Sequence, residues 1–243
     1  GTVETDARAA LALYDQCPAK HQTELRASPA LAEPCGVDQV WLKMEDQRMG
    51  LGSFKALGAA YAIAKQAAKK VGSDADAATM ATALEGETFI CASAGNHGLS
   101  VAAGARLFGA KAVVLLSDTV PEEFADRLRQ KGAVVERAGE NYEASMVASK
   151  QMAEAEGWNL LSDGSWLGYS DPPRDVMEGY LIMGHEVADQ IAQPPTHVFL
   201  QAGVGGLAAG CTVTARSRWG DDVQIAVVEP QAAPALIESV RAG

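Results

Sequence analysis

Lys55 is the residue of this sequence best placed for covalent chemistry. It follows the glycine-rich segment Gly50 to Phe54 and precedes an alanine-rich stretch with helical spacing, which predicts a helix from about Ser53. A cation in the first turn opposes the helix dipole, so we expect a neutral amine, which can form an imine with a carbonyl compound. Taken alone, however, Lys55 is better interpreted as an ordinary surface lysine.

Two further segments have the pattern of a strand, a loop of small residues and a helix. The loop SAGNHG, from Ser93 to Gly98, follows the apolar run 88–92, and the loop GVGGLAAG, from Gly203 to Gly210, follows the run 198–200. Glycines let the backbone approach an anion closely, and the N–H groups at a helix start point at it. We therefore expect backbone donors for a phosphate group at Gly203, Val204, Gly205, Gly206 and Leu207.

The same glycine loop also fits a dinucleotide site. The segment from Gly203 to Ala208 matches a variant of the Rossmann fingerprint, and Glu229 lies about twenty residues further on, where a ribose ligand would sit. A nicotinamide-dependent oxidoreductase is therefore an alternative. It is less favoured because the fingerprint normally belongs to the first βαβ unit and because it leaves Lys55 and Asn96 without a role.

In this order, the motifs GSFK, SAGNHG and GVGGLAAG resemble those of the fold type II pyridoxal phosphate-dependent enzymes. This family includes threonine and serine dehydratases, threonine synthase and diaminopropionate ammonia-lyase, and the resemblance covers nearly the whole chain. It implies an α/β fold like that of the tryptophan synthase β-subunit, with two parallel-sheet, three-layer domains. It also implies that pyridoxal 5'-phosphate lies between them, bound to Lys55 as an imine, with Asn96 beside the cofactor ring oxygen.

The resemblance further assigns the SAGNHG loop to the carboxylate of an amino-acid substrate. The residues concerned are Ser93, Ala94, Gly95, Asn96 and His97. The simpler alternative is that Asn96 caps the following helix and that His97 is an exposed first-turn residue, and for His97 we prefer this alternative. Ser53 is likewise sufficiently explained as a helix N-cap, which leaves open any role in proton transfer.

Other segments resemble diaminopropionate ammonia-lyase more than threonine dehydratase. They are DGSWLGY at 163–169, MEGY at 177–180, and KALG at 55–58, where the dehydratases usually carry arginine before the glycine. One position departs from the ammonia-lyases, which have an aspartate assigned to proton transfer where this chain has Ala94. Asp163 is then the carboxylate expected to bind or protonate the leaving group, with a loop-capping aspartate as the alternative.

The implied function is a pyridoxal phosphate-dependent β-elimination on a small amino acid such as 2,3-diaminopropionate, which yields a 2-oxo acid and ammonia. Lys55 would also act as the general base at Cα. A serine, threonine or hydroxyaspartate dehydratase is the close alternative, and a catalytically silent amino-acid sensor on this fold is a more distant one. The expected assembly is a homodimer.

Composition indicates a globular protein. The 243 residues are 48% hydrophobic and 21% charged, and the net charge of −11 without a basic stripe argues against nucleic acid as a partner. The four cysteines lack the spacing of a metal or disulfide site, and no apolar run is long enough to span a bilayer. We expect a cytoplasmic protein without a metal site or membrane contact.

From Thr88 onward, apolar runs and helical patterns alternate, which predicts parallel β/α units. We expect an irregular connection at 21–31, one long helix at about 174–190, and a break at 162–172. By resemblance, a smaller domain with Lys55 spans 35–160, and a larger domain with the glycine loop spans 1–34 plus 161–243. Family members continue past the strand ending at Val228, and the partner of the pyridine nitrogen lies there, so we expect the larger domain to be incomplete at its C-terminus.

Overall fold

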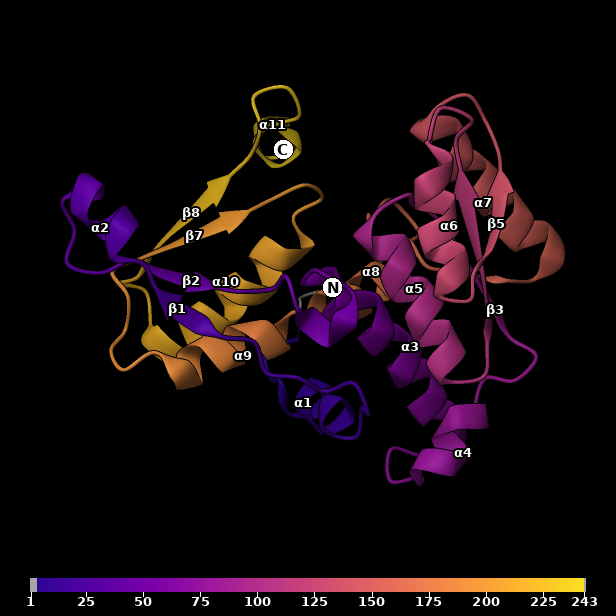
Figure 1. Cartoon of the computed structure of the whole chain (residues 1–243), viewed down its shortest axis with the longest axis horizontal. Helices are drawn as coiled ribbons and strands as arrows, with labels where there is room; N and C mark the ends of the chain where they lie inside the picture. The colour runs from indigo at the N-terminus through magenta and orange to yellow at the C-terminus, as the bar shows by residue number, and fades with distance from the viewer. Residues whose placement is uncertain (1–3, 243) are drawn as a thin grey trace.

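The computed structural model describes residues 4–242, and Figure 1 shows their arrangement. The helices are α1 (Arg8–Asp15), α2 (Pro29–Cys35), α3 (Lys55–Val71), α4 (Ala77–Thr82), α5 (Asn96–Leu107), α6 (Glu122–Gln130), α7 (Tyr142–Glu156), α8 (Asp171–Gly179), α9 (Leu181–Gln190), α10 (Gly206–Trp219) and α11 (Ala235–Ala242), with a 3₁₀ turn η1 (Arg48–Gly50). The strands are β1 (Leu25–Ala27), β2 (Trp41–Lys43), β3 (Thr88–Ala92), β4 (Lys111–Leu116), β5 (Val134–Arg137), β6 (Asn159–Leu160), β7 (His197–Gln201) and β8 (Gln224–Val228). None of the helices in the described part of the chain has the length and apolar character needed to cross a membrane.

Four parallel strands form the larger sheet, in the order β5-β4-β3-β6. Strand β3 is buried along its whole length because helices cover both faces of the sheet. Successive side chains point to opposite faces. Phe89 and Cys91 pack in the main core with residues of α3, α5 and α6, whereas Ile90 and Leu115 pack with Ala153 of α7 on the other face. The expected α/β fold with a parallel sheet is confirmed.

Helix α3 is the central helix of the molecule and packs against both α5 and α8. Its contact with α8 depends on two glycines. A Cβ atom built on Gly58 would lie 2.7 Å from the ring of Tyr180, and one built on Gly179 would lie 2.4 Å from the carbonyl oxygen of Leu57. Any larger residue would separate the helices, so the two glycines bring the first turns of α3 next to Tyr180.

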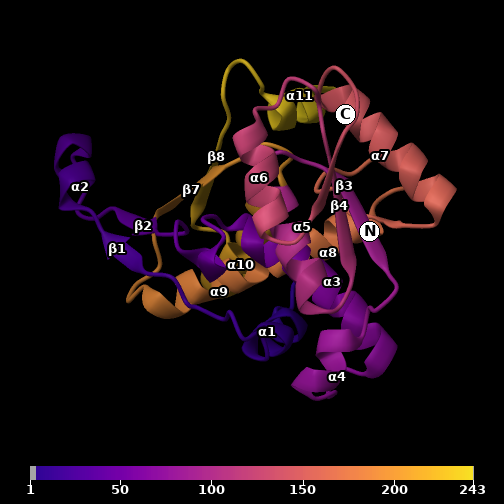
Figure 2. The ribbon, with the colours of Figure 1, turned by 45° about the vertical axis from the view of Figure 1, so that its right-hand side comes forward.

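Two small sheets form the other side of the molecule. Strands β7 and β8 pair in parallel, and strands β1 and β2 pair antiparallel. Figure 2 shows that β1, β2 and α2 extend from the molecule at the end opposite α7. The predicted boundary at residue 35 falls between β1 and β2, which pair with each other, so we propose that the smaller domain begins after η1 instead. Residues 1–3 of the predicted larger domain lie outside the described residues.

A buried ion cluster ties η1 to α9. Arg48 is fully buried and donates hydrogen bonds of 2.6 Å to the carboxylates of Glu45 and Glu186. Lys43 Nζ lies 2.7 Å from Glu186. A buried guanidinium is tolerated only when it is paired and hydrogen-bonded in this way. The segment that leads to Lys55 is thereby held against a helix that lies far away in the sequence.

Several elements differ from the sequence-based expectation. The segment 21–31, expected as an irregular connection, contains β1 and the start of α2, where Pro29 occupies a first-turn position that suits its fixed φ. The single helix expected at 174–190 is two helices, α8 and α9, which meet at Tyr180. Helix α4 and the two-residue strand β6 were not predicted, because both are too short to show a hydrophobic period.

Candidate active site

The carboxyl ends of β3 and β7 and the N-terminal ends of α3 and α10 meet at a cavity of about 300 Å³. Its walls come from all three motifs of the sequence. The lining residues are Phe54, Lys55, Ser93, Tyr142, Asp163, Val176, Tyr180, Gln201, Ala202, Gly203, Val204, Gly205, Gly206 and Leu207. Binding sites in α/β proteins commonly lie at such strand ends, so this cavity is the candidate active site.

Lys55 and Asp163 form an ion pair in this cavity. Lys55 is the first residue of α3, and its Nζ donates a hydrogen bond of 2.5 Å to Oδ2 of Asp163. The side chains are 32% and 14% exposed, so the pair is open to the cavity while it is largely shielded from bulk solvent. The sequence argument left the lysine cation without a compensating charge, and in this respect it was wrong because Asp163 supplies that charge.

Asp163 is held in its ionised form by its surroundings. Burial raises the pKa of this carboxyl, but the charge and the hydrogen bond of Lys55 lower it, and the net pKa lies below its ordinary value. The loop itself is fixed by its own hydrogen bonds, since Gly164 N donates to Ser162 Oγ and Ser162 N donates to Tyr169 Oη. Asp163 is therefore a rigidly placed acceptor for Lys55.

The glycine loop ends at the first turn of α10. Gly205 is the N-cap residue and has a φ of +86°, which a β-branched residue rarely adopts. No backbone N–H from Gly203 to Leu207 donates a hydrogen bond to another residue within 4–242. Several free donors and the positive end of a helix dipole therefore border the cavity, which suits an anion. Five predicted cofactor residues, Gly203, Val204, Gly205, Gly206 and Leu207, line it.

The SAGNHG loop contributes less to the cavity than expected, because Ser93 alone among its residues lines it. Ala94 is half-buried, and Gly95 and Asn96 are exposed. Gly95 is the N-cap residue of α5, so the alternative role of Asn96 as a helix cap is not seen. A Cβ atom built on Gly98 would lie 2.3 Å from the carbonyl oxygen of Ser93, which explains the second glycine of the motif.

The preferred interpretation of His97 as an exposed residue was wrong. His97 is 2% exposed, and its Nε2 donates a hydrogen bond of 2.8 Å to the carbonyl oxygen of Leu161, two residues before Asp163. Its Nδ1 is buried without a hydrogen-bond partner among residues 4–242. Burial lowers the pKa of the imidazole, which favours the neutral ring. His97 thus links the SAGNHG loop to the loop of Asp163.

Six residues of the cavity lining were not predicted as site residues: Phe54, Tyr142, Val176, Tyr180, Gln201 and Ala202. Phe54 precedes Lys55, and its ring contacts that of Tyr180 edge-on with the centroids 5.4 Å apart. Tyr180 belongs to the MEGY segment, which resembles diaminopropionate ammonia-lyase. That resemblance did not by itself assign Tyr180 to the site. No sequence motif predicts that Tyr142 and Gln201 line the cavity, because only the fold brings them there.

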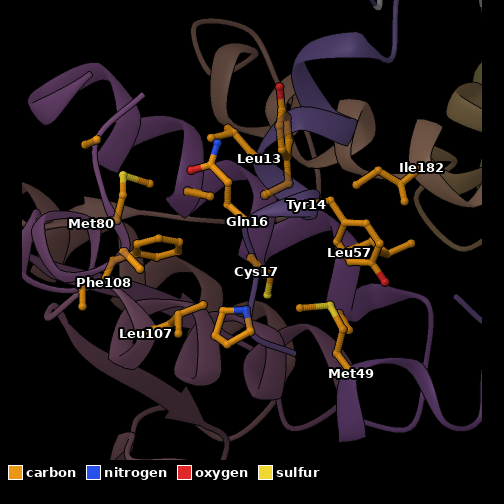
Figure 3. Close-up of a pocket in the computed structure, with 18 of the residues that line it drawn as sticks. Leu13, Tyr14, Gln16, Cys17, Met49, Leu57, Met80, Leu107, Phe108 and Ile182 are labelled. Carbon is orange, nitrogen blue, oxygen red and sulfur yellow. The ribbon is translucent and has the colours of Figure 1, made fainter. Parts of the chain in front are cut away.

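A second cavity, of about 530 Å³, lies on the face of α3 opposite Lys55. Figure 3 shows its walls, which include Leu13, Tyr14, Met49, Met80 and Phe108. The lining is mostly apolar and contains neither a lysine nor a histidine. Its carboxylates, Asp74 and Asp76, have no basic side chain beside them in this lining, whereas the smaller cavity pairs a lysine with a carboxylate, so the smaller cavity is the candidate site.

A lysine paired with an acid, beside free backbone donors for an anion, defines an α/β enzyme that holds a phosphorylated carbonyl cofactor. The chain belongs to the pyridoxal-phosphate dependent enzyme family, whose model matches residues 17–243. Pyridoxal phosphate is accordingly its cofactor. Because the chain belongs to this family, the alternative of a nicotinamide-dependent oxidoreductase with a dinucleotide at the glycine loop no longer applies.

Relatives within this family are diaminopropionate ammonia-lyases and dehydratases. The chain is 33% identical over 242 residues to the diaminopropionate ammonia-lyase of Salmonella typhimurium, covering 94% of this chain and 60% of the relative. It is also 33% identical to a chloroplastic threonine dehydratase of Solanum lycopersicum, covering 92% of this chain and 33% of the relative. The structure of holo diaminopropionate ammonia-lyase from Escherichia coli superposes with a TM-score of 0.91 at 29% identity, covering 100% of this chain and 66% of that one. The chain thus spans about 60% of the length of the Salmonella typhimurium enzyme.

Proposed function

We propose that this chain carries the catalytic site of a pyridoxal phosphate-dependent ammonia-lyase. The substrate would be a small amino acid such as 2,3-diaminopropionate, and the products a 2-oxo acid and ammonia. The observation that carries the proposal is the ion pair of Lys55 and Asp163 in a cavity bordered by the glycine loop. Similarity to diaminopropionate ammonia-lyases over nearly the whole chain supports the choice of reaction.

The residues of the cavity fit the cofactor. Lys55 would hold it through Nζ, and the free N–H groups from Gly203 to Leu207 would receive its phosphate. The cavity volume of about 300 Å³ is at the lower end of the usual range for small-ligand sites. The predicted contact of Asn96 with the cofactor ring stays a proposal.

Different residues of the chain would carry out the separate steps of the elimination. Bound pyridoxal phosphate supplies an electron sink for the carbanion left when the Cα proton is removed. Lys55 Nζ accepts that proton, and Asp163, at 2.5 Å, stabilises the resulting ammonium. Asp163 is also the carboxylate placed to bind the departing amine. We propose that the loop from Ser93 to His97 holds the substrate carboxylate, with Ser93 nearest the cavity.

Elimination of water from a β-hydroxy amino acid is the second candidate function. The observation that favours it is Ala94, a methyl group where diaminopropionate ammonia-lyases were expected to carry an aspartate. An amine leaves poorly without a nearby acid, and the loss of one acid site weakens ammonia-lyase chemistry. Similarity to a threonine dehydratase supports this candidate as well.

Two measurements test the proposal. Borohydride reduction with bound pyridoxal phosphate, followed by peptide mapping, should label Lys55 and no other lysine. Turnover of 2,3-diaminopropionate, serine and threonine, each as separate stereoisomers, then identifies the leaving group. A label on another lysine would contradict the assignment of Lys55. Turnover of the hydroxy amino acids alone would replace the ammonia-lyase by a dehydratase.

We further propose a homodimer in the cytoplasm. The four cysteines are free thiols, which supports a reducing compartment. Sedimentation should give twice the mass of one chain, and a monomeric mass would contradict the dimer.

A further inference from the structure

Tyr180 connects the helix that carries Lys55 with the helix that starts at the glycine loop. Its Cζ and Oη would lie 2.7 Å from a Cβ atom built on Gly58, three residues after Lys55. Its Cε2 would lie 3.6 Å from a Cβ atom built on Gly206, the first residue of α10. The ring thus lies between the first turns of α3 and α10, where Gly58 leaves room for it and Gly206 is within van der Waals distance.

The hydroxyl group of Tyr180 has no protein partner. The residue is 3% exposed, yet Oη makes no hydrogen bond within residues 4–242, although buried tyrosine hydroxyls normally find one. Oη is also not sealed in the protein interior, since Tyr180 lines the cavity of Lys55 and Asp163. Burial raises the pKa of the phenol, so the hydroxyl keeps its proton and can act as a donor. The missing partner therefore belongs to the ligand of the cavity.

The charges around the cavity indicate which part of the ligand accepts the hydrogen bond of Tyr180 Oη. Lys55 is the one cation among the lining side chains, and Asp163 neutralises it. The positive ends of α3 and α10 remain, together with the free backbone donors from Gly203 to Leu207. These donors suit an anion, and the ring of Tyr180 lies near the first residue of the same helix α10.

We propose that Tyr180 Oη donates a hydrogen bond to the phosphate group of the cofactor. The phosphate would then be held by one side-chain donor in addition to the backbone donors predicted from the sequence. The inference rests on the pyridoxal phosphate cofactor and not on the ammonia-lyase reaction, because it concerns binding before any turnover.

The test compares two cofactor forms in Tyr180→Phe. This change removes one oxygen and keeps the ring that packs against Gly58 and Gly206. A hydrogen bond to a charged group contributes substantially to the binding free energy. Because the variant lacks this bond, the Kd of pyridoxal phosphate should rise roughly 10- to 100-fold. Pyridoxal, which lacks the phosphate, should bind the variant and the original chain equally. Both values come from the change in cofactor absorbance on titration, so no activity is needed.

The matched control is Tyr61→Phe. Tyr61 is also a buried tyrosine, on α3 itself, but it lines the second cavity and its hydroxyl donates to Glu178 at 3.4 Å. This variant should leave both Kd values unchanged. Equal weakening of pyridoxal and pyridoxal phosphate in Tyr180→Phe would place the hydroxyl at the ring end of the cofactor and overturn the proposal. Unchanged affinity for pyridoxal phosphate, or an original chain that binds the two forms equally, would overturn it too.

Discussion

The two residues proposed to carry the chemistry, Lys55 and Asp163, form an ion pair although they are 108 positions apart in the sequence. The carboxylate does more than neutralise the ammonium. Its lowered pKa keeps it ionised at neutral pH, so it can orient Lys55 Nζ and, in the proposed reaction, receive the departing amine. With Ala94 at the position of a second acid, the chain has no other carboxylate among the residues that line the cavity.

Asp163→Asn should therefore lower the turnover of 2,3-diaminopropionate strongly. The amide keeps the shape of the side chain but cannot accept a proton or pair with an ammonium, and one positioned acid–base group contributes roughly 10²–10⁴-fold to a rate. We expect that loss in kcat, with turnover of one stereoisomer at most in the original chain. The measurement is steady-state kinetics on each stereoisomer.

The control for this variant is Asp171→Asn. Asp171 starts α8 and pairs with Arg174, and its side chain is 77% exposed and outside the cavity. Its kinetics should match those of the original chain. Full activity in Asp163→Asn, or efficient turnover of both stereoisomers by the original chain, would show that the acid lies elsewhere.

At the scale of elements, the glycines of the molecule have two separate tasks. Gly58 and Gly179 let α3 and α8 approach closely, as does Gly98 for α5 and its preceding loop. Gly205 instead supplies a positive φ that turns the chain from β7 into α10. Gly203 has neither a positive φ nor a neighbour within 4 Å of a built Cβ atom, so its lack of a side chain leaves space beside the cavity.

Gly205→Val should weaken cofactor binding more than it weakens the fold. A β-branched residue at a φ of +86° costs about 1–3 kcal/mol of unfolding free energy and bends the loop away from the orientation in which its N–H groups meet a phosphate. We expect a loss of cofactor retention in dialysis, together with a modest fall in Tm.

The control is Gly157→Val, at the C-terminal end of α7. Gly157 has a left-handed backbone with a φ of +66°, as Gly205 has with a φ of +86°, and no atom lies within 4 Å of a Cβ atom built on it, so the backbone strain is similar but lies outside the cavity lining. This variant should lose a similar amount of stability and retain the cofactor. Unchanged cofactor affinity in a folded Gly205→Val variant would contradict the loop assignment.

Local patterns were enough to predict the elements that carry the motifs. The apolar runs 88–92 and 198–200 lie in β3 and β7, and the helix expected from about Ser53 is α3, because apolar runs, caps and glycines act over a few residues. Helix α4 and strand β6 are too short for such patterns. The junction of α8 and α9 at Tyr180 was missed for another reason, since the break occurs without a proline or a left-handed residue.

At the scale of the whole molecule, the unpredicted features are those that depend on contacts between distant segments. The burial of His97 against Leu161 leaves no trace in local spacing, and the MEGY segment, which contains Tyr180, does not show that this ring lies between two helices. The same holds for Arg48, which the sequence presents as a charged residue in a polar segment and the fold buries completely. Its partner Glu186 lies 138 positions away.

The cluster of Arg48 and Glu186 should therefore be a strong determinant of stability. Glu186 is 6% exposed and accepts hydrogen bonds from Arg48 and Lys43, and its removal leaves buried cations with too little negative charge. Breaking a buried ion pair from one side costs about 3–5 kcal/mol, so Glu186→Gln should lower the unfolding free energy by about 3 kcal/mol at pH 7, because Glu45 still pairs with Arg48. Urea unfolding of the cofactor-free chain measures this difference.

The pH dependence distinguishes an electrostatic role of Glu186 from simple packing. Burial raises the pKa of Glu186, but Arg48 and Lys43 lower it by more, so the folded-state pKa lies below the unfolded value. Its contribution is then fully present above the unfolded pKa of about 4.3 and is lost as the pH falls through the folded-state pKa. The difference in unfolding free energy between the original chain and Glu186→Gln should accordingly be constant from about pH 6 to 8. It should become smaller below about pH 4. The exposed Glu122, which pairs with Arg129 and Arg137, is the control, and Glu122→Gln should change the unfolding free energy far less than Glu186→Gln, because solvent screens exposed ion pairs. A gap that stays constant down to pH 3 would mean that Glu186 stabilises the molecule by its shape rather than by its charge.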